Sequence, residues 1–220
     1  MDFSLVMAQC LSGLFRGMML FLIASGLSLI FGVMNILNFA HASLWLVGAY
    51  FAYTFWYLLQ DYGFGLWLSI ALASLTLAVI GWLIEVVLIR RVYDRELPEQ
   101  LLLTYAMVLI IGDLIKLTWG VEDRIIARPP LVAGPVFFLG IPFDSYFIFV
   151  ILIGLSVAIG LWLFLKKTRY GHIVRAAVFS REMVSALGIP IPRIYTGVFV
   201  LGIFIAGLAG AVQAPVGSIT

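Results

Sequence analysis

Six long apolar segments run through this 220-residue chain, and they constrain its fold more than any other feature. Each is about 20 residues long, the length that an α-helix needs to cross the hydrocarbon core of a bilayer. Charged residues make up only 11% of the chain, too few to cover a water-facing surface. This excludes secreted, disordered and nucleic-acid-binding classes. We predict an all-α, polytopic transmembrane helical bundle forming one domain over residues 1–220, with spans at 14–34, 42–60, 66–89, 100–119, 146–165 and 191–212. Residues 3–13 either extend the first span or form a short interfacial helix.

The distribution of basic residues predicts the orientation of these spans. Residues 90–99 contain three Lys or Arg residues and residues 166–193 contain six, so these two stretches hold nine of the 13 in the chain. Two spans separate them, so both must face the same side of the membrane. The excess of positive charge on cytoplasmic loops puts both in the cytoplasm and the 120–144 loop outside. The side on which the N-terminus lies stays open.

A polar interruption between the first two apolar segments predicts a broken helix near residues 32–43. Asn35, Asn38, His41 and Ser43 lie there, and polar groups in such a setting need partners or must face a cavity. Transporters often bind substrate where a membrane helix is interrupted. A short loop at the membrane surface between two complete spans is the alternative. These four residues are our candidates for the lining of a substrate path.

Residues 166–190 differ from the rest of the chain because they are polar and basic. Their length suits one short helix followed by another, with Gly188 and Pro190 ending the second. Apolar residues at 173, 174, 177 and 178 give the first helix one apolar face. Such a helix either lies on lipid or docks into a cytoplasmic partner, and a solvated loop is the plain alternative.

The remaining ionisable and small residues have structural explanations. Asp113 and Lys116 are three residues apart on one helix face and can pair, and Glu85 lies near basic neighbours. Glycine and alanine cluster in the last span, which is typical of close helix packing. We find no catalytic constellation, no phosphate-binding loop, no metal-ligand cluster and no need for a cofactor. The single cysteine, Cys10, excludes a disulfide within the chain.

Two stretches together resemble the integral-membrane permeases of branched-chain amino acid ABC transporters. The first is Gly26–Met34 running into Asn38-Phe39-Ala40-His41. The second contains Arg169-Tyr170-Gly171, Arg175-Ala176, Arg181-Glu182 and Leu187-Gly188-Ile189, followed by Gly207-Leu208-Ala209-Gly210. The family usually has glycine after the histidine, where this chain has Ala42. Relatives also continue through further spans beyond the position of Thr220, so the chain resembles a C-terminally truncated member.

The resemblance implies a function and a set of partners. Residues 166–190 would hold the coupling helix that docks into cytoplasmic ABC ATPase subunits, with Arg169, Tyr170, Gly171, Arg175, Arg181, Glu182 and Gly188 as candidate coupling residues. The break at 35–43 would lie near the translocation path. An extracytoplasmic solute-binding protein would deliver the amino-acid substrate, and a second permease subunit would complete the pathway in the cell inner membrane. ATP hydrolysis would take place on the separate subunits, so this chain itself is not an enzyme.

Other functions stay open at this point. One is a secondary transporter driven by an ion gradient, with Asp113 or His41 as the ion site. Another is a membrane scaffold with no path of its own. Within the ABC family, the substrate is either a branched-chain or other hydrophobic amino acid, or an amide, urea or an aromatic acid.

Overall fold

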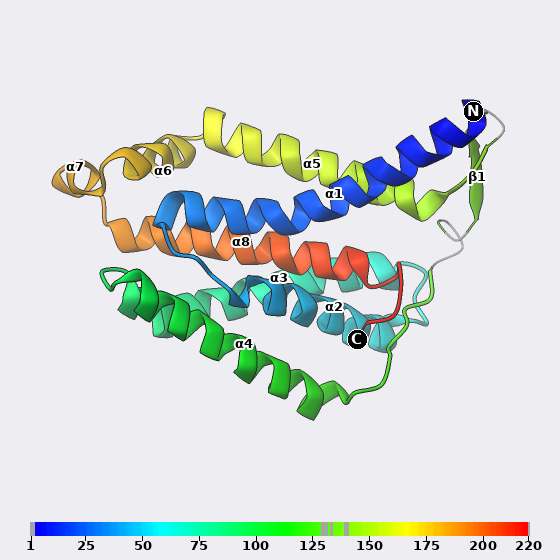
Figure 1. Cartoon of the computed structure of the whole chain (residues 1–220), viewed down its shortest axis with the longest axis horizontal. Coiled ribbons are helices and arrows are strands. Elements are labelled where there is room, and N and C mark those ends of the chain that lie inside the picture. Colours follow the sequence, from blue (N-terminus) through cyan, green and yellow to red (C-terminus); the bar gives the residue numbers. More distant parts are fainter. Residues whose placement is uncertain (1–2, 129–131, 133, 139–140, 220) are drawn as a thin grey trace.

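The computed structural model describes residues 3–128, 132, 134–138 and 141–219, and it consists mainly of six long helices (Figure 1). All six are long and apolar enough to cross a membrane, which confirms the predicted all-α bundle and its spans. Lipid offers no hydrogen-bond partners, so a spanning segment satisfies its backbone within its own helix. The helices are α1 (Phe3–Met34), α2 (Ala40–Leu59), α3 (Gly65–Val87), α4 (Leu97–Trp119), α5 (Ser145–Lys167) and α8 (Ile191–Gln213). Residues 3–13 therefore extend the first helix, and the interfacial-helix alternative is wrong.

Shorter elements connect these helices. The 3-10 helix η1 (Ile89–Val92) lies between α3 and α4, and α6 (Arg169–Phe179) and α7 (Arg181–Ala186) lie between α5 and α8. Strands β1 (Pro135–Phe138) and β2 (Ile141–Asp144) form an antiparallel hairpin in which Pro135 pairs with Asp144. The sequence predicts only a loop here, so the hairpin is an addition to the predicted fold.

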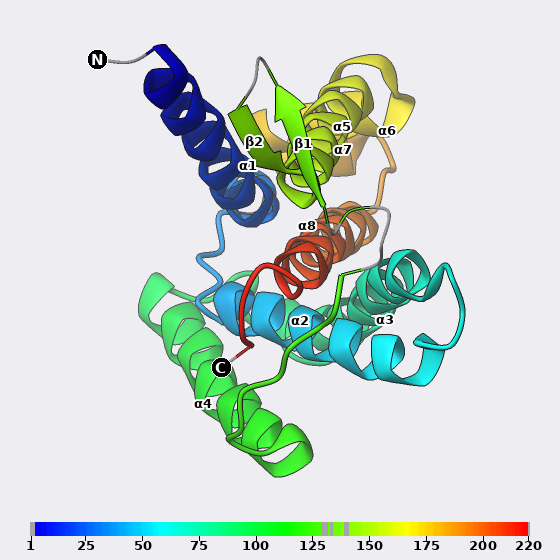
Figure 2. The same cartoon turned by 90° about the vertical axis from the view of Figure 1, so that its right-hand side faces the viewer.

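Helix α8 is the centre of the bundle. Figure 2 shows it end-on, with α1, α2, α3 and α5 around it, and its closest contacts are with α1, α2 and α3. Most of the small residues predicted to mediate packing are buried along it, including Gly202, Ala206 and Gly207. A Cβ atom built on Gly48 of α2 would lie 2.8 Å from the Cα atom of Gly207. The absence of side chains at these positions lets the helix backbones approach closely, as predicted.

The outer helices are less enclosed. Helix α4 packs mainly against α2 and diverges from the bundle toward its C-terminal end, while α5 packs against α1 (Figure 1). Their outward faces carry large exposed apolar side chains such as Leu102, Leu117 and Leu152. These faces are suited to contact with lipid or with other membrane-spanning segments.

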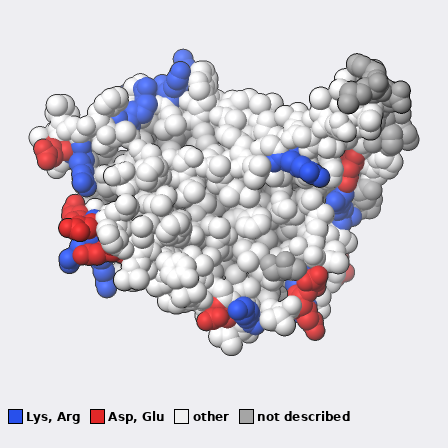
Figure 3. All heavy atoms as spheres, in the orientation of Figure 1, with Lys and Arg blue, Asp and Glu red and all other residues white. Residues whose placement is uncertain are grey.

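Charged side chains gather mainly at the two ends of the bundle, with a largely uncharged belt between them (Figure 3). We call the end formed by residues 88–96 and 166–190 the basic end, and the opposite end, with the β1–β2 hairpin, the hairpin end. Arg181 pairs with Asp94 at 3.4 Å, which confirms that the two basic stretches lie on the same side. Helix α1 begins at the hairpin end and finishes at the basic end (Figure 1).

Candidate functional site

The first candidate site is the non-helical segment between α1 and α2. Helix α1 ends at Met34, and Asn35 adopts a left-handed backbone conformation with φ of 54°. The chain then turns back into the bundle, where Ile36 is fully buried (Figure 1). The side-chain oxygen of Asn38 accepts a hydrogen bond of 3.1 Å from the backbone N–H of Ala40, the first residue of α2. Asn38 thus satisfies one of the free donors at the start of this helix.

His41 shows how deep this segment lies. Its Nε2 atom donates to the backbone carbonyl of Ile23, 3.1 Å away. At a rise of about 1.5 Å per residue, Ile23 lies about 16 Å along the helix axis from Met34, where α1 ends. The first turn of α2 therefore packs beside α1 well before its end, so the connecting segment runs from the basic end, where Asn35 is exposed, into the bundle. Non-helical backbone at this depth is tolerated only where protein buries it or where it lines a cavity.

The four predicted path residues do not form a single cluster. Asn38 and His41 are buried inside the bundle, Asn35 is exposed at the basic end, and Ser43 is half-buried. The amide nitrogen of Asn38 and the Nδ1 atom of His41 have no hydrogen-bond partner among the described residues. Of the four residues, Asn38 and His41 are therefore the ones that bury a polar atom without a partner among the described residues.

The second candidate site is the α6–α7 hairpin at the basic end. Two short helices with separate caps form it, as predicted: the Thr168 hydroxyl accepts from Gly171 N–H, and the Ser180 hydroxyl accepts from Met183 N–H. Gly171 lies against the carbonyl of Phe164, where a Cβ atom would clash with the backbone. Gly188, with φ of 81°, ends the second helix. These features fix the path of the hairpin out of the bundle.

Tyr170 ties this hairpin to the central helix. Its hydroxyl lies 3.1 Å from each of the backbone carbonyls of Arg193 and Ile194, at the start of α8. Burial raises the pKa of Tyr170, so the hydroxyl keeps its proton and donates it to these carbonyls. Among the predicted coupling residues, Tyr170 therefore anchors the hairpin.

The charged candidates of the hairpin point outward. Arg169, Arg175, Arg181 and Glu182 are exposed, and of these only Arg181 forms an ion pair within the described residues. A hollow of about 480 Å³ lies beside them, between the end of α1 and the α6–α7 junction. Asn35, Arg181 and Glu182 all line it. One predicted path residue, Asn35, and two predicted coupling residues, Arg181 and Glu182, therefore line the same hollow.

Sequence reasoning missed an apolar surface on the same hairpin. Phe179, Met183 and Leu187 are 93%, 67% and 75% exposed. We call these three residues the apolar tip. They lie at the basic end, beyond the apolar belt, where exposed residues of this size mark a protein or membrane contact. Their spacing of four residues indicates that they share one helix face. In a short helix, however, the same spacing is equally typical of a face that is buried.

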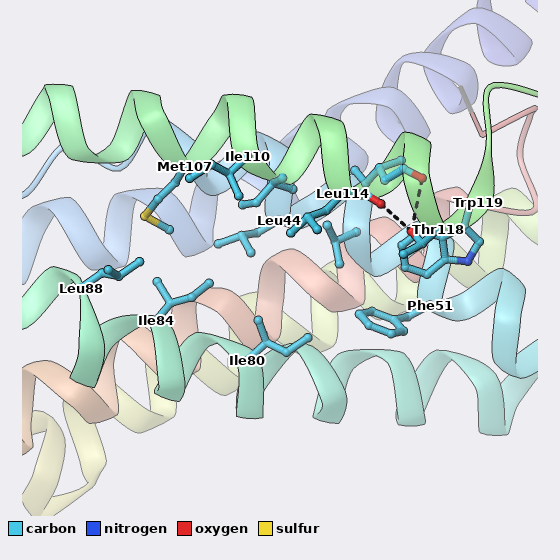
Figure 4. Close-up of a pocket in the computed structure, with 13 residues that line it drawn as sticks. Leu44, Phe51, Ile80, Ile84, Leu88, Met107, Ile110, Leu114, Thr118 and Trp119 are labelled. Atoms are coloured by element: carbon cyan, nitrogen blue, oxygen red, sulfur yellow. Dashed lines mark hydrogen bonds between the residues drawn. The ribbon is translucent and has the colours of Figure 1, made fainter.

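An apolar groove of about 370 Å³ lies between α2, α3 and α4 (Figure 4). Only two of its lining residues carry polar side-chain groups. The Thr118 hydroxyl donates to the Leu114 carbonyl at 2.7 Å, and the Trp119 indole N–H donates to Thr54 at 2.8 Å. Both groups are thus occupied within the chain. The groove offers nothing to the ammonium and carboxylate of an amino acid, so it is not the site for such a solute.

Other ionisable groups have structural partners. Asp113 and Lys116 form the predicted pair at 3.8 Å, and both are exposed on α4. Glu85 pairs with Arg90 at 3.2 Å, as its position suggested. Within the described part of the chain no group of three or more His, Cys, Asp or Glu side chains is arranged to hold a metal ion.

Comparison with known proteins places this architecture in a family. Residues 9–219 match the family described as branched-chain amino acid transport system / permease component. The chain is 26% identical to the high-affinity branched-chain amino acid transport system permease protein LivH of Escherichia coli, over 95% of this chain and 70% of that protein. It is 27% identical to the corresponding permease protein BraD of Pseudomonas aeruginosa, over 91% of this chain and 68% of that protein.

The chain is 29% identical to the probable branched-chain amino acid transport permease protein LivH of Methanocaldococcus jannaschii, over 87% of this chain and 61% of that protein. No solved structure matches the chain. The six membrane-spanning helices and the family match, which covers nearly the whole chain, lead to one conclusion. The chain belongs to the branched-chain amino acid transport permease family, and it is a multi-pass membrane subunit of a transport system.

Proposed function

We propose that this chain is the membrane-spanning permease subunit of an ATP-driven ABC importer for branched-chain amino acids. The named relatives are permeases of high-affinity branched-chain amino acid transport systems, which supports this substrate class. The chain would act as a single transmembrane domain in the inner membrane, with the basic end in the cytoplasm. Nine of the 13 basic residues lie within residues 90–99 and 166–193 at that end, as the positive-inside rule requires.

The observation that carries this proposal is the apolar tip of the α6–α7 hairpin. A permease that uses ATP hydrolysed by other subunits needs a cytoplasmic surface on which those subunits bind. Phe179 is 93% exposed at the basic end, and complete burial of such a side chain contributes about 1.5–3 kcal/mol. The hairpin is also anchored to α8 through Tyr170, so a partner that moves the hairpin acts on the central helix.

The proposed cycle is alternating access. Two cytoplasmic ATPase subunits bind ATP, close on each other and move the α6–α7 hairpins of two permease subunits. The spans then rock and open the path to the cytoplasm. A solute-binding protein on the outer face supplies the substrate and most of the selectivity. Asn35, Asn38, His41 and Ser43 remain the candidate path residues, and the two unpartnered polar atoms on Asn38 and His41 favour the buried pair.

The test is co-purification and uptake with the complete transport complex. Phe179→Asp and Met183→Asp replace apolar contact with charge, and loss of a contact worth about 1.5–3 kcal/mol lowers affinity by about 10–150-fold. We expect both variants to lose the ATPase subunits on purification and to lose ATP-dependent leucine uptake. Val121→Asp is the matched control, because Val121 is 84% exposed at the opposite end.

Several results would contradict the proposal. One is that both tip variants retain the ATPase and full uptake. Another is that uptake by the wild-type complex depends on a proton gradient and not on ATP, which would point to a secondary transporter.

A competition assay tests the substrate class. We expect valine and isoleucine to compete with leucine for uptake, and urea, amides and aromatic acids not to compete.

A further inference from the structure

A fully buried carboxylate lies near the end of α3, at the basic end of the bundle. Glu85 has no exposed surface, and its two oxygens are 3.3 and 3.2 Å from the Nε and Nη2 atoms of Arg90. The Tyr93 hydroxyl also donates to Glu85. The same Nη2 atom of Arg90 donates to the Thr196 hydroxyl of α8 at 2.9 Å. Glu85 therefore connects α3, the loop after it and α8.

We call residues 88–96, which join α3 to α4, the cytoplasmic loop. Burial and the hydrogen bond to Glu85 raise the pKa of Tyr93, so its phenol keeps the proton that it donates to the carboxylate. The Glu85 carboxylate is fully buried, whereas the Arg90 side chain is 40% exposed, so removal of Arg90 would leave an uncompensated buried charge. The cluster of Glu85, Arg90 and Tyr93 thus fixes where the cytoplasmic loop lies on α3 and α8.

The outer side of this loop contacts the coupling hairpin. Asp94, the residue after Tyr93, pairs with Arg181 of α7 at 3.4 Å. The Tyr93 ring packs edge-on against Tyr195 of α8, with ring centroids 5.1 Å apart. A hollow of about 620 Å³ lies between the loop, α7 and the start of α8, lined by these four side chains among others. Helix α7 thus faces the start of α8 across an open hollow, and Arg181 provides its charged contact to the loop.

We propose that the cytoplasmic loop is a second transmission element, through which displacement of α7 reaches α3 and α8. The order of contacts is Arg181 to Asp94, then the adjacent Tyr93, then Glu85 with Arg90. Glu85 and Arg90 are positioning residues in this scheme, because they hold the loop and do not touch the solute. The inference rests on the proposed function, and it adds a route into the bundle besides the anchoring of α6 by Tyr170.

The route explains why a charge is buried at this point. Helix α3 carries no other charged residue. An apolar residue at position 85 would pack without a desolvation cost, but it would not hold Arg90 and Tyr93 at fixed positions. A hydrogen-bonded carboxylate fixes the direction of three donors at once. The burial of Glu85 is thus suited to moving the loop, α3 and α8 together.

The experiment uses the complete transport complex in proteoliposomes, with leucine uptake and ATP hydrolysis measured in the same vesicles. The readout is leucine transported per ATP hydrolysed, which a purely structural role would not change. Coupling between two sites typically corresponds to about 5–150-fold, so we expect Glu85→Gln to reduce this ratio at least about fivefold. Glu99→Gln is the matched control, because it breaks the exposed Arg95–Glu99 pair of the same region, at 3.6 Å.

A charge exchange at the surface keeps the test independent of folding. Asp94 and Arg181 are 92% and 53% exposed, and exposed pairs contribute little to stability. We expect Asp94→Arg to lower the transport ratio and the double variant Asp94→Arg, Arg181→Asp to restore at least half of it. An unchanged ratio in Asp94→Arg, or no recovery in the double variant, would overturn the inference. If the wild-type complex itself shows no ATP-driven uptake, the proposed function fails instead.

Discussion

Replacing Gly48 with alanine tests whether backbone contact holds α2 on α8. An added Cβ would lie 2.8 Å from the Cα and 2.9 Å from the carbonyl oxygen of Gly207, whereas ordinary contact begins at 3.4 Å. Both neighbours are backbone atoms, so no change of rotamer relieves the overlap, and the helices must separate by about 0.6 Å. Overpacking of this kind costs about 1–3 kcal/mol, which exceeds the gain of about 0.5–1 kcal/mol from removing a glycine from a helix.

Gly160→Ala in α5 is the matched control for this prediction. A Cβ at Gly160 meets nothing within 4 Å, so only the helix-propensity gain applies there. We expect thermal unfolding in mild detergent, followed by size-exclusion chromatography, to show a lower midpoint for Gly48→Ala and an unchanged or higher one for Gly160→Ala. Shifts of the same sign and size in both variants would refute the packing argument.

Two further predictions concern the ends of helices. Asp144 accepts a hydrogen bond from the Tyr146 N–H at the start of α5 and pairs with Arg128. We expect Asp144→Ala to destabilise the protein by about 1–2 kcal/mol, and Asp144→Asn, which keeps the cap, to destabilise it by less. Equal thermal midpoints for the two variants would contradict this. Gly188 has a φ of 81°, so an alanine there is expected to strain the end of α7 by about 1–2 kcal/mol. We expect Gly188→Ala to increase proteolysis between residues 166 and 190, and Gly188→Asn to increase it by a smaller amount.

The long apolar segments made the spans predictable, because a bilayer requires both their length and their composition. The 35–39 segment was only partly predictable. Its polar residues indicated an interruption, but the sequence left open whether it lay at the surface or within the bundle. That depends on the packing of α2 against α1, which the bond from His41 to Ile23 reveals. The β1–β2 hairpin was missed because prolines are disfavoured in strands, and Pro135 and Pro142 lie within these two.

The two short helices expected within residues 166–190 are present, but the exposed apolar residues on them were not predicted. The candidate coupling residues, such as Arg175 and Glu182, come from the family resemblance, whereas the apolar tip depends on which side of α7 faces the bundle. Val184 is buried and Met183, its neighbour, is exposed. In a helix of six residues, no periodic pattern is long enough to distinguish these two faces.

The way α8 packs has a consequence for motion in the membrane. Its contacts to α1 and α2 are partly between backbones: a Cβ on Gly26 would lie 2.5 Å from the carbonyl oxygen of Gly202, and one on Gly48 would meet Gly207. Side chains adjust to a shift between helices by changing rotamers, but backbones in contact have no such freedom. Helices α1, α2 and α8 therefore turn as one rigid unit, whereas α4 is held on α2 through side chains, such as Trp119 on Thr54, and can shift relative to that unit.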